Sequence, residues 1–205
     1  MSATNRGAKR RARDCYFTPA YCTRLLVENV ELPGGFWLEP TAGEGAIITE
    51  VNRLRANVCW SACEIRPRCA PALQRAVGDG PVVIADFLKT TVGTFGRELF
   101  APHDVAVSNP PYYLAQEVLE HSLELARTVV LLLRLNYLES EKRANFLRAH
   151  PPDVYVLPSR PSFCANRQGK RGTDATAYAW MVWPRARRRR GSIRVLPSLP
   201  REERI

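Results

Sequence analysis

Short apolar segments alternate with segments of helical periodicity along most of this chain, and this alternation restricts the fold more than any other feature. The apolar runs, each bounded by turn-forming or acidic residues, are 36–38, 58–63, 82–85, 105–107, 129–133, 154–157 and 177–183. Helical segments are expected near 19–30 and at 46–55, 66–77, 114–126 and 140–150. Strands that alternate with helices pair in parallel, because the crossover helix returns the chain to the same end of the sheet. The sequence therefore predicts an α/β fold with a seven-stranded, mostly parallel sheet and helices on both faces.

Basic residues are concentrated at the two ends of the chain. The formal net charge is +10, yet residues 1–13 carry five basic and no acidic residues, and residues 184–205 carry eight arginines and two glutamates. The remainder is nearly neutral, so we expect a basic arm at 1–14, one domain at 15–183 and a basic tail at 184–205. Basic arms on a neutral domain favour a polyanionic partner, and arginine suits phosphate. Nucleic acid is therefore the predicted partner, and a solubilising role for idle arms is the alternative.

The cysteine and histidine positions argue against a metal site. No two of the six cysteines form a C-x-x-C pair, and the three histidines are scattered. We expect no metal and reduced, structural cysteines, with Cys59 and Cys63 buried on one side of a strand. The longest apolar run is far shorter than the ~20 residues that span a membrane, and no apolar segment follows the N-terminal arginines. These features predict a protein without a membrane partner that is located in the cytoplasm of a bacterium or of a viral host; the oligomeric state stays open.

Residues suited to an adenosine-bearing ligand follow the first three predicted strands, where parallel sheets bind ligands. Gly43 and Gly45 form a strand-to-helix turn that lets backbone approach a ligand. This turn lacks the lysine of a phosphate-binding P-loop and the third small residue of a dinucleotide fingerprint. Glu64 is placed to accept hydrogen bonds from ribose hydroxyls, and Asp86 from an exocyclic amine, while the Phe87 ring can stack on a purine. Helix capping is the alternative role for both carboxylates.

The most specific string in the chain, Asn109-Pro110-Pro111-Tyr112, follows the fourth predicted strand. The two prolines fix two φ angles and remove two backbone donors, so the loop is stiff and its carbonyls remain acceptors. The Asn109 side-chain oxygen and the Pro110 carbonyl can both accept hydrogens from one amino group. Tyr112 adds a ring for stacking.

Together with the segment Glu39 to Ile47, this string resembles the class I S-adenosylmethionine-dependent methyltransferases that methylate planar amino groups, most of all the N6-adenine DNA methyltransferases. The resemblance covers roughly residues 15–183 and implies a Rossmann-like methyltransferase fold with S-adenosylmethionine as cofactor. It implies that the cofactor is bound by Tyr16, Phe17, Thr18, Glu39, Thr41, Gly43, Gly45, Glu64, Asp86, Phe87 and Asn109. It implies a catalytic role for Asn109, Pro110, Pro111 and Tyr112, and a contact of Phe163 with the target base.

The chemistry implied by this resemblance is methyl transfer to the N6 amine of adenine in DNA, with the base turned out of the helix. The same tetrapeptide serves methyltransferases that act on ribosomal RNA bases or on a glutamine of release factors. A nucleic-acid-binding module that kept the fold and lost catalysis is the remaining alternative. The Tyr16-to-Pro19 string together with Phe163 favours DNA adenine.

The chain departs from large members of that family because no segment is long enough for a target-recognition domain. Only 42 residues follow Phe163. Recognition would then fall to loops and arms, and we expect Lys170 and Arg171, in the basic loop 166–174, to contact phosphate. The arginine run 187–190, with Arg185, is the second candidate for phosphate contact; a nuclear localisation signal and an idle tail are the alternatives. A short or relaxed recognition sequence follows from this expectation.

Overall fold

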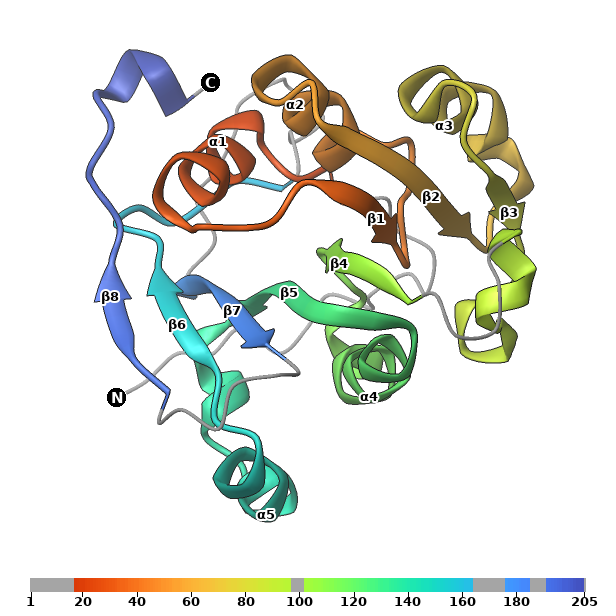
Figure 1. Ribbon diagram of the computed structural model, residues 1–205. Helices are drawn as coiled ribbons and strands as arrows, with labels where there is room; N and C mark the ends of the chain where they lie inside the picture. Colours follow the sequence, from red (N-terminus) through yellow and green to blue (C-terminus); the bar gives the residue numbers. More distant parts are fainter. Residues whose placement is uncertain (1–16, 97–101, 164–175, 185–190, 205) are drawn as a thin grey trace, which may run out of the picture.

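Among the described residues of the computed structural model, eight strands form one sheet in the order β3-β2-β1-β4-β5-β7-β6-β8 (Figure 1). The structure describes residues 17–96, 102–163, 176–184 and 191–204. The strands are β1 (Gly35–Glu39), β2 (Val58–Glu64), β3 (Val82–Ile84), β4 (His103–Ser108), β5 (Ala126–Arg134), β6 (Asp153–Val156), β7 (Tyr178–Pro184) and β8 (Ile193–Val195). β7 runs antiparallel to both of its neighbours, whereas the other pairs are parallel. The fold is therefore a Rossmann-like α/β fold with a mostly parallel sheet, as predicted.

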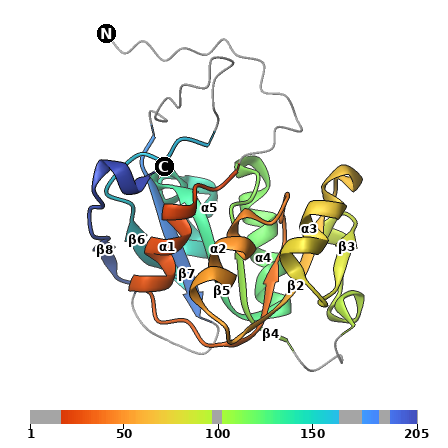
Figure 2. The ribbon, with the colours of Figure 1, turned by 90° about the horizontal axis from the view of Figure 1, so that it is seen from above.

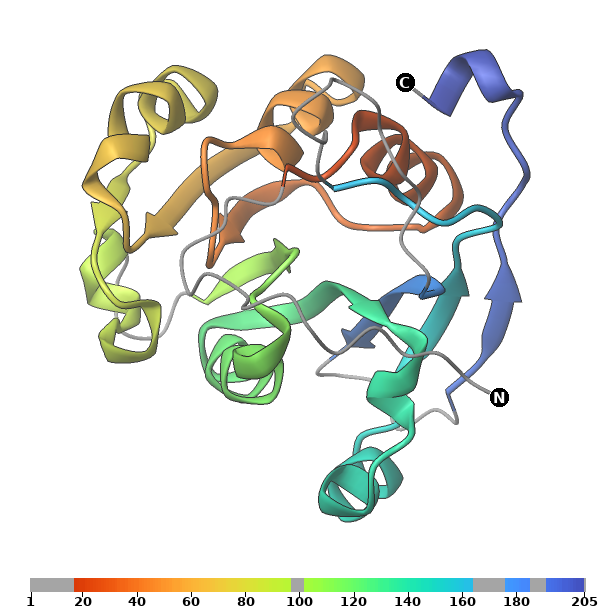
Figure 3. The same cartoon turned by 180° about the vertical axis from the view of Figure 1, so that it is seen from behind.

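Helices cover both faces of the sheet. The α-helices are α1 (Ala20–Asn29), α2 (Ala46–Leu54), α3 (Ala70–Val77), α4 (Ala115–Leu125) and α5 (Glu141–Ala149). Short 3₁₀ turns span Pro67–Cys69, Phe87–Lys89, Val92–Phe95, Tyr112–Leu114, Leu135–Leu138 and Arg201–Arg204. Helices α1, α2 and α3 lie side by side over one face, and α4 and α5 lie on the other (Figures 1, 2 and 3).

The central strand β5 shows why the apolar runs carry no polar alternation. Val130 and Leu132 point into the core beneath α1, α2 and α3. Val129, Leu131 and Leu133 point into the second core, which packs against α4. Successive strand side chains face opposite sides, so a strand covered on both faces must be apolar throughout. A wholly apolar run is therefore the sequence signature of a central strand in this fold.

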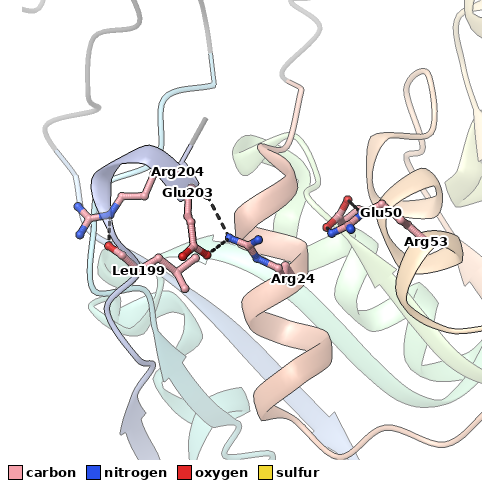
Figure 4. Close-up of polar contacts among 6 residues, drawn as sticks. All are labelled: Arg24, Glu50, Arg53, Leu199, Glu203 and Arg204. Carbon is pink, nitrogen blue, oxygen red and sulfur yellow. Dashed lines mark hydrogen bonds and ion pairs between the residues drawn. The ribbon is translucent and has the colours of Figure 1, made fainter.

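All seven predicted strands are present, but the sheet has an eighth strand that the sequence reasoning missed. β8 lies within the segment expected to be a tail and pairs in parallel with β6. Leu196 after it is buried, and farther on the Arg24 guanidinium donates to a Glu203 carboxylate oxygen at 3.1 Å (Figure 4). The prediction of seven strands was therefore wrong by one, because a three-residue strand beside an arginine run gives little periodic signal.

The expectation for Cys59 was also wrong. Cys63 is buried, whereas Cys59, four residues earlier on the same side of β2, is exposed. The parity of a strand gives the face on which a side chain lies, but not how far the covering helix extends along it.

No helix in the described segments is both long and apolar enough to cross a membrane. Within those segments no group of three or more His, Cys, Asp or Glu side chains is arranged to hold a metal ion.

Candidate active site

The Asn109 side chain stands at the carboxyl end of β4 and is bonded at both ends. Its Nδ2 donates to the Thr18 hydroxyl at 3.2 Å. Its Oδ1 accepts from the Tyr112 hydroxyl at 3.2 Å. Thr18 directly precedes Pro19 and α1 and is buried, while Asn109 and Tyr112 are half-buried. Three of the residues predicted for the site thus meet, although Thr18 is 91 positions away from Asn109 in the sequence.

The Tyr112 ring is held by a cation and a second aromatic ring. The Arg134 guanidinium lies 4.6 Å from the centre of the Tyr112 ring. The same guanidinium donates through Nε to the Tyr178 hydroxyl at 3.0 Å, and the rings of Tyr112 and Tyr178 are 5.8 Å apart. Arg134 ends β5 and Tyr178 begins β7, and the two are paired across the sheet. An Arg over an aromatic face is an attractive cation–π contact, so the ring has a defined position.

Phe163, expected to contact a target base, lies behind this group. Its side chain is buried and its ring packs edge-on against Tyr178, with the ring centres 5.0 Å apart. In this structure Phe163 therefore supports Tyr178, and its contact with a target base stays a prediction.

The turn between β1 and α2 has the tight geometry that its glycines predicted. Gly43 and Gly45 both have positive φ angles, of 58° and 83°. A Cβ on Gly45 would lie 2.7 Å from the Cβ of Ala76 on α3, so this glycine also permits the close packing of α2 on α3. Thr41 in the same turn shares a 2.6 Å hydroxyl–hydroxyl hydrogen bond with Ser108, the residue before Asn109.

Glu64 ends β2 and is bound to the neighbouring turn. Its carboxylate accepts from the Gly43 backbone N–H at 2.7 Å and from the backbone and side chain of Arg66. Burial alone would raise the pKa of Glu64, but the hydrogen bonds and charge of Arg66 and the Gly43 N–H outweigh it and hold that pKa below its ordinary value. Glu64 is therefore an ionised acceptor at neutral pH.

Glu39 ends β1 and is almost completely buried, with 2% of its surface exposed. Its Oε2 makes no hydrogen bond within the described residues. Burial raises the pKa of Glu39 well above its ordinary value; a backbone hydrogen bond from Ile48 opposes this, and the Glu64 charge adds to it. A buried carboxyl oxygen without a donor is costly, so this atom marks a position where a ligand donor would be stabilising.

Asp86 and Phe87, at the end of β3, make contacts within the protein, and their expected contact with an adenine stays a prediction. Asp86 accepts from the Leu88 backbone N–H at 3.2 Å and caps the 3₁₀ turn, which is the alternative role considered for it. The Phe87 ring is buried and packs edge-on against His121 at 4.9 Å. The ring therefore belongs to the core in this structure, because helix α4 covers that side of the sheet.

Several predicted residues lie outside the described residues. These are Tyr16, Lys170 and Arg171, together with the arm 1–14 and the arginine run 187–190. Phe17 is described and is 48% exposed beside the buried Thr18.

Comparison with known proteins identifies the fold. No protein-family model and no curated protein sequence matches the chain. A protein of Pyrococcus horikoshii described as an RNA methyltransferase superposes with a TM-score of 0.62 and 15% identity over 83% of this chain and 87% of that one. The chain has the fold of class I methyltransferases.

Two further solved structures agree on this class I methyltransferase fold. A Vibrio vulnificus protein described as a modification subunit of a type I restriction enzyme gives a TM-score of 0.60 at 12% identity, over 90% of this chain and 46% of that one. A Listeria monocytogenes protein described as a class I S-adenosylmethionine-dependent methyltransferase gives a TM-score of 0.56 at 13% identity, over 89% of this chain and 65% of that one.

Sequence reasoning missed five residues of this site. Ser108, Arg134 and Tyr178 hold the predicted residues by the contacts above, and Ile65 and Tyr113 are exposed apolar side chains next to Glu64 and Tyr112. Ile65 carries a readable signal, because it is an apolar residue between Glu64 and Arg66, whereas Tyr113 lies among other apolar residues and carries none. Arg134 and Tyr178 carry no such signal, because their roles depend on the pairing of β5 with β7.

Proposed function

We propose that this protein transfers a methyl group from S-adenosylmethionine to the exocyclic N6 amine of adenine in DNA. The observation that carries the proposal is the Asn109 carboxamide, fixed at the end of β4 with its oxygen toward Tyr112 and its nitrogen on Thr18. A carboxamide oxygen beside a proline carbonyl and an aromatic ring suits a planar amine. The fold shared with class I methyltransferases supports the choice of cofactor.

The residues at the neighbouring strand ends fit this cofactor. The buried Glu39 Oε2, which has no donor among the described residues, matches the positively charged amino group of its methionine part. The ionised Glu64 matches the ribose hydroxyls, which would replace the donations from the Arg66 side chain. Ile65, 65% exposed beside Glu64, offers apolar contact to the adenine ring.

S-adenosylmethionine supplies, when bound, a methyl carbon on a cationic sulfur, and that sulfur keeps the electron pair of the broken S–C bond as the amine nitrogen forms the new C–N bond. Asn109 Oδ1 and the Pro110 carbonyl accept the two amine hydrogens. This draws the nitrogen toward tetrahedral geometry and frees its lone pair for attack. Orientation of this kind can supply about 7–11 kcal/mol of the barrier reduction. The amine loses one proton to water after transfer.

We propose DNA as the substrate in preference to RNA or protein. The basic charge at both ends of the chain favours a nucleic acid over a release-factor glutamine. Similarity to a protein described as a type I modification subunit supports DNA, while similarity to one described as an RNA methyltransferase makes an RNA base the second candidate. Loss of catalysis with retention of nucleic-acid binding is the last alternative.

The test is transfer of labelled methyl to unmethylated DNA, bulk RNA and a release-factor protein in parallel. Label recovered as N6-methyladenine in DNA, and absent with Asn109→Ala, supports the proposal. Asn145→Ala, on the exposed side of α5, is the matched control and should keep full activity. Thermal unfolding of both variants separates lost chemistry from lost folding. Label in RNA or protein alone would replace the substrate, and no label anywhere would favour the binding module.

A test of phosphate contact by the basic ends requires substitutions and not truncation. Deleting residues 185–205 would also remove β8 and the buried Leu196, so a loss of DNA binding would have two causes. Replacing the arginines of 187–190 with glutamine leaves β8 in place. We expect weaker DNA binding and a shallower dependence of affinity on salt. An unchanged affinity at low salt would contradict phosphate contact by this run.

A further inference from the structure

We infer that Thr18 is a positioning residue, whose hydroxyl orients the Asn109 carboxamide for catalysis. This inference rests on the proposed function and deepens it. The resemblance assigns Thr18 to cofactor binding, whereas the structure shows its hydroxyl accepting from Asn109 Nδ2 at 3.2 Å. The two roles predict different kinetic effects, so they can be separated.

Orientation matters because the two ends of a carboxamide have opposite hydrogen-bonding character. An oxygen facing the substrate amine accepts its hydrogens. If the carboxamide NH2 stood there instead, two hydrogen-bond donors would face each other and no hydrogen bond would form. The acceptor at Thr18 holds the Asn109 nitrogen away from the Tyr112 side of the site. The oxygen is thereby presented where the amine must bind.

Thr18 is itself held rigidly enough to do this. Pro19 follows it, which restricts Thr18 to extended backbone, and the Pro19 carbonyl accepts the N–H of Cys22 at 3.0 Å. The Cys22 carbonyl in turn accepts from the Trp180 indole of β7 at 2.8 Å. Since both Cys22 and Trp180 are fully buried, the start of α1 is fixed to the sheet that carries the site.

A second contact fixes the backbone next to Asn109. Ser108, which is fully buried, shares its 2.6 Å hydroxyl–hydroxyl bond with Thr41 of the turn after β1. The end of β4 is therefore tied on one side to the Thr41 turn and on the other to the segment before α1. Thr18 supplies the contact that reaches the amide itself.

The experiment compares Thr18→Val, Thr18→Ser and Thr23→Val. Valine keeps the size of threonine and loses the acceptor, while serine keeps the acceptor. Thr23 is a matched control, because it is also buried, lies on α1, and its hydroxyl has no hydrogen-bond partner within the described residues. We expect kcat to fall about tenfold or more in Thr18→Val with the cofactor Kd unchanged, and both other variants to stay near wild type. An unchanged kcat in Thr18→Val, or a loss confined to the cofactor Kd, would overturn the inference.

A double-mutant cycle on thermal stability tests the contact without any methyl transfer. If Thr18 and Asn109 are bonded, the destabilisation of Thr18→Val combined with Asn109→Ala is less than the sum of the single effects. Additive effects would overturn the inference. A wild-type protein that methylates nothing, together with a coupled cycle, would refute the proposed function and leave the Thr18–Asn109 contact standing.

Discussion

Replacing Gly45 with alanine tests how the turn that begins the candidate site is built. Gly45 precedes α2 with φ 83° and ψ 35°, in the left-handed region. An added Cβ would lie 2.7 Å from the Ala76 Cβ and 3.3 Å from the Leu73 Cδ1. Both neighbours belong to α3, which packs directly against α2, and the Ala76 Cβ cannot move without shifting that helix.

The expected cost has two parts. Left-handed backbone costs an L-residue about 1–2 kcal/mol, of which the stiffer unfolded chain of alanine returns about 0.4–1 kcal/mol. Overpacking of a close helix contact adds about 1–3 kcal/mol. The sum is about 1.5–4 kcal/mol, which corresponds to a fall in Tm of about 3–16 °C for a chain of this size.

Gly96→Ala is the matched control. Gly96 has φ 67° in the same left-handed region, but among the described residues a Cβ there would meet nothing within 4 Å. Its expected loss is therefore the backbone part alone, about 0.5–1 kcal/mol. Thermal and urea unfolding of both variants gives the difference. Equal losses in the two variants would refute the close approach of α2 to α3 at Gly45.

Three further predictions follow from buried side chains. Burial raises the folded-state pKa of Glu39 above its unfolded value, so the wild type should lose stability as the pH rises from about 4 toward that raised pKa. Glu39→Gln should not show this loss in thermal melts over about pH 4–8, and it should bind the cofactor less tightly. Iodoacetamide should modify Cys59 before Cys22 and Cys63, whose thiol pKa values burial raises to about 12, and peptide mass spectrometry would show a contrary order. Phe163→Ala should cost about 3–5 kcal/mol of stability because its ring packs on Tyr178, and a loss of activity in a fully stable variant would contradict that supporting role.

The sequence was sufficient to predict seven of the eight described strands and the residues that follow the first four of them. Apolar runs covered on both faces, such as the one in β5, are unmistakable because no polar residue interrupts them. It was not sufficient for the direction of single side chains. Asp86 and Phe87 follow β3 as expected, but their side chains cap a turn and fill the core, because the position of α4 decides which side of the sheet is closed.

The burial of the cysteines likewise separates what the sequence pattern predicts from what depends on tertiary packing. Cys59 and Cys63 lie on one side of β2, as their even spacing requires, yet only Cys63 is buried. The period of a strand is a local property that a sequence carries directly. The extent of the cover over that strand depends on where a helix distant in the sequence comes to rest.

Tyr178 was missed because β7 runs antiparallel to its neighbours, and the sequence analysis considered only residues that follow the carboxyl ends of strands. Parallel strands bring their carboxyl ends to the ligand edge, so a search there finds Glu39, Glu64 and Asn109. An antiparallel strand brings its first residue to that edge, and β7 does so: Tyr178 pairs with Arg134 at the end of β5. No helical segment separates the sixth and seventh apolar runs, which fits the reversal because a parallel connection needs a crossover. The same holds between the third and fourth runs, whose strands are parallel, so this feature does not single out β7. In a sheet of this kind the residues that begin such a strand belong in the search for the site.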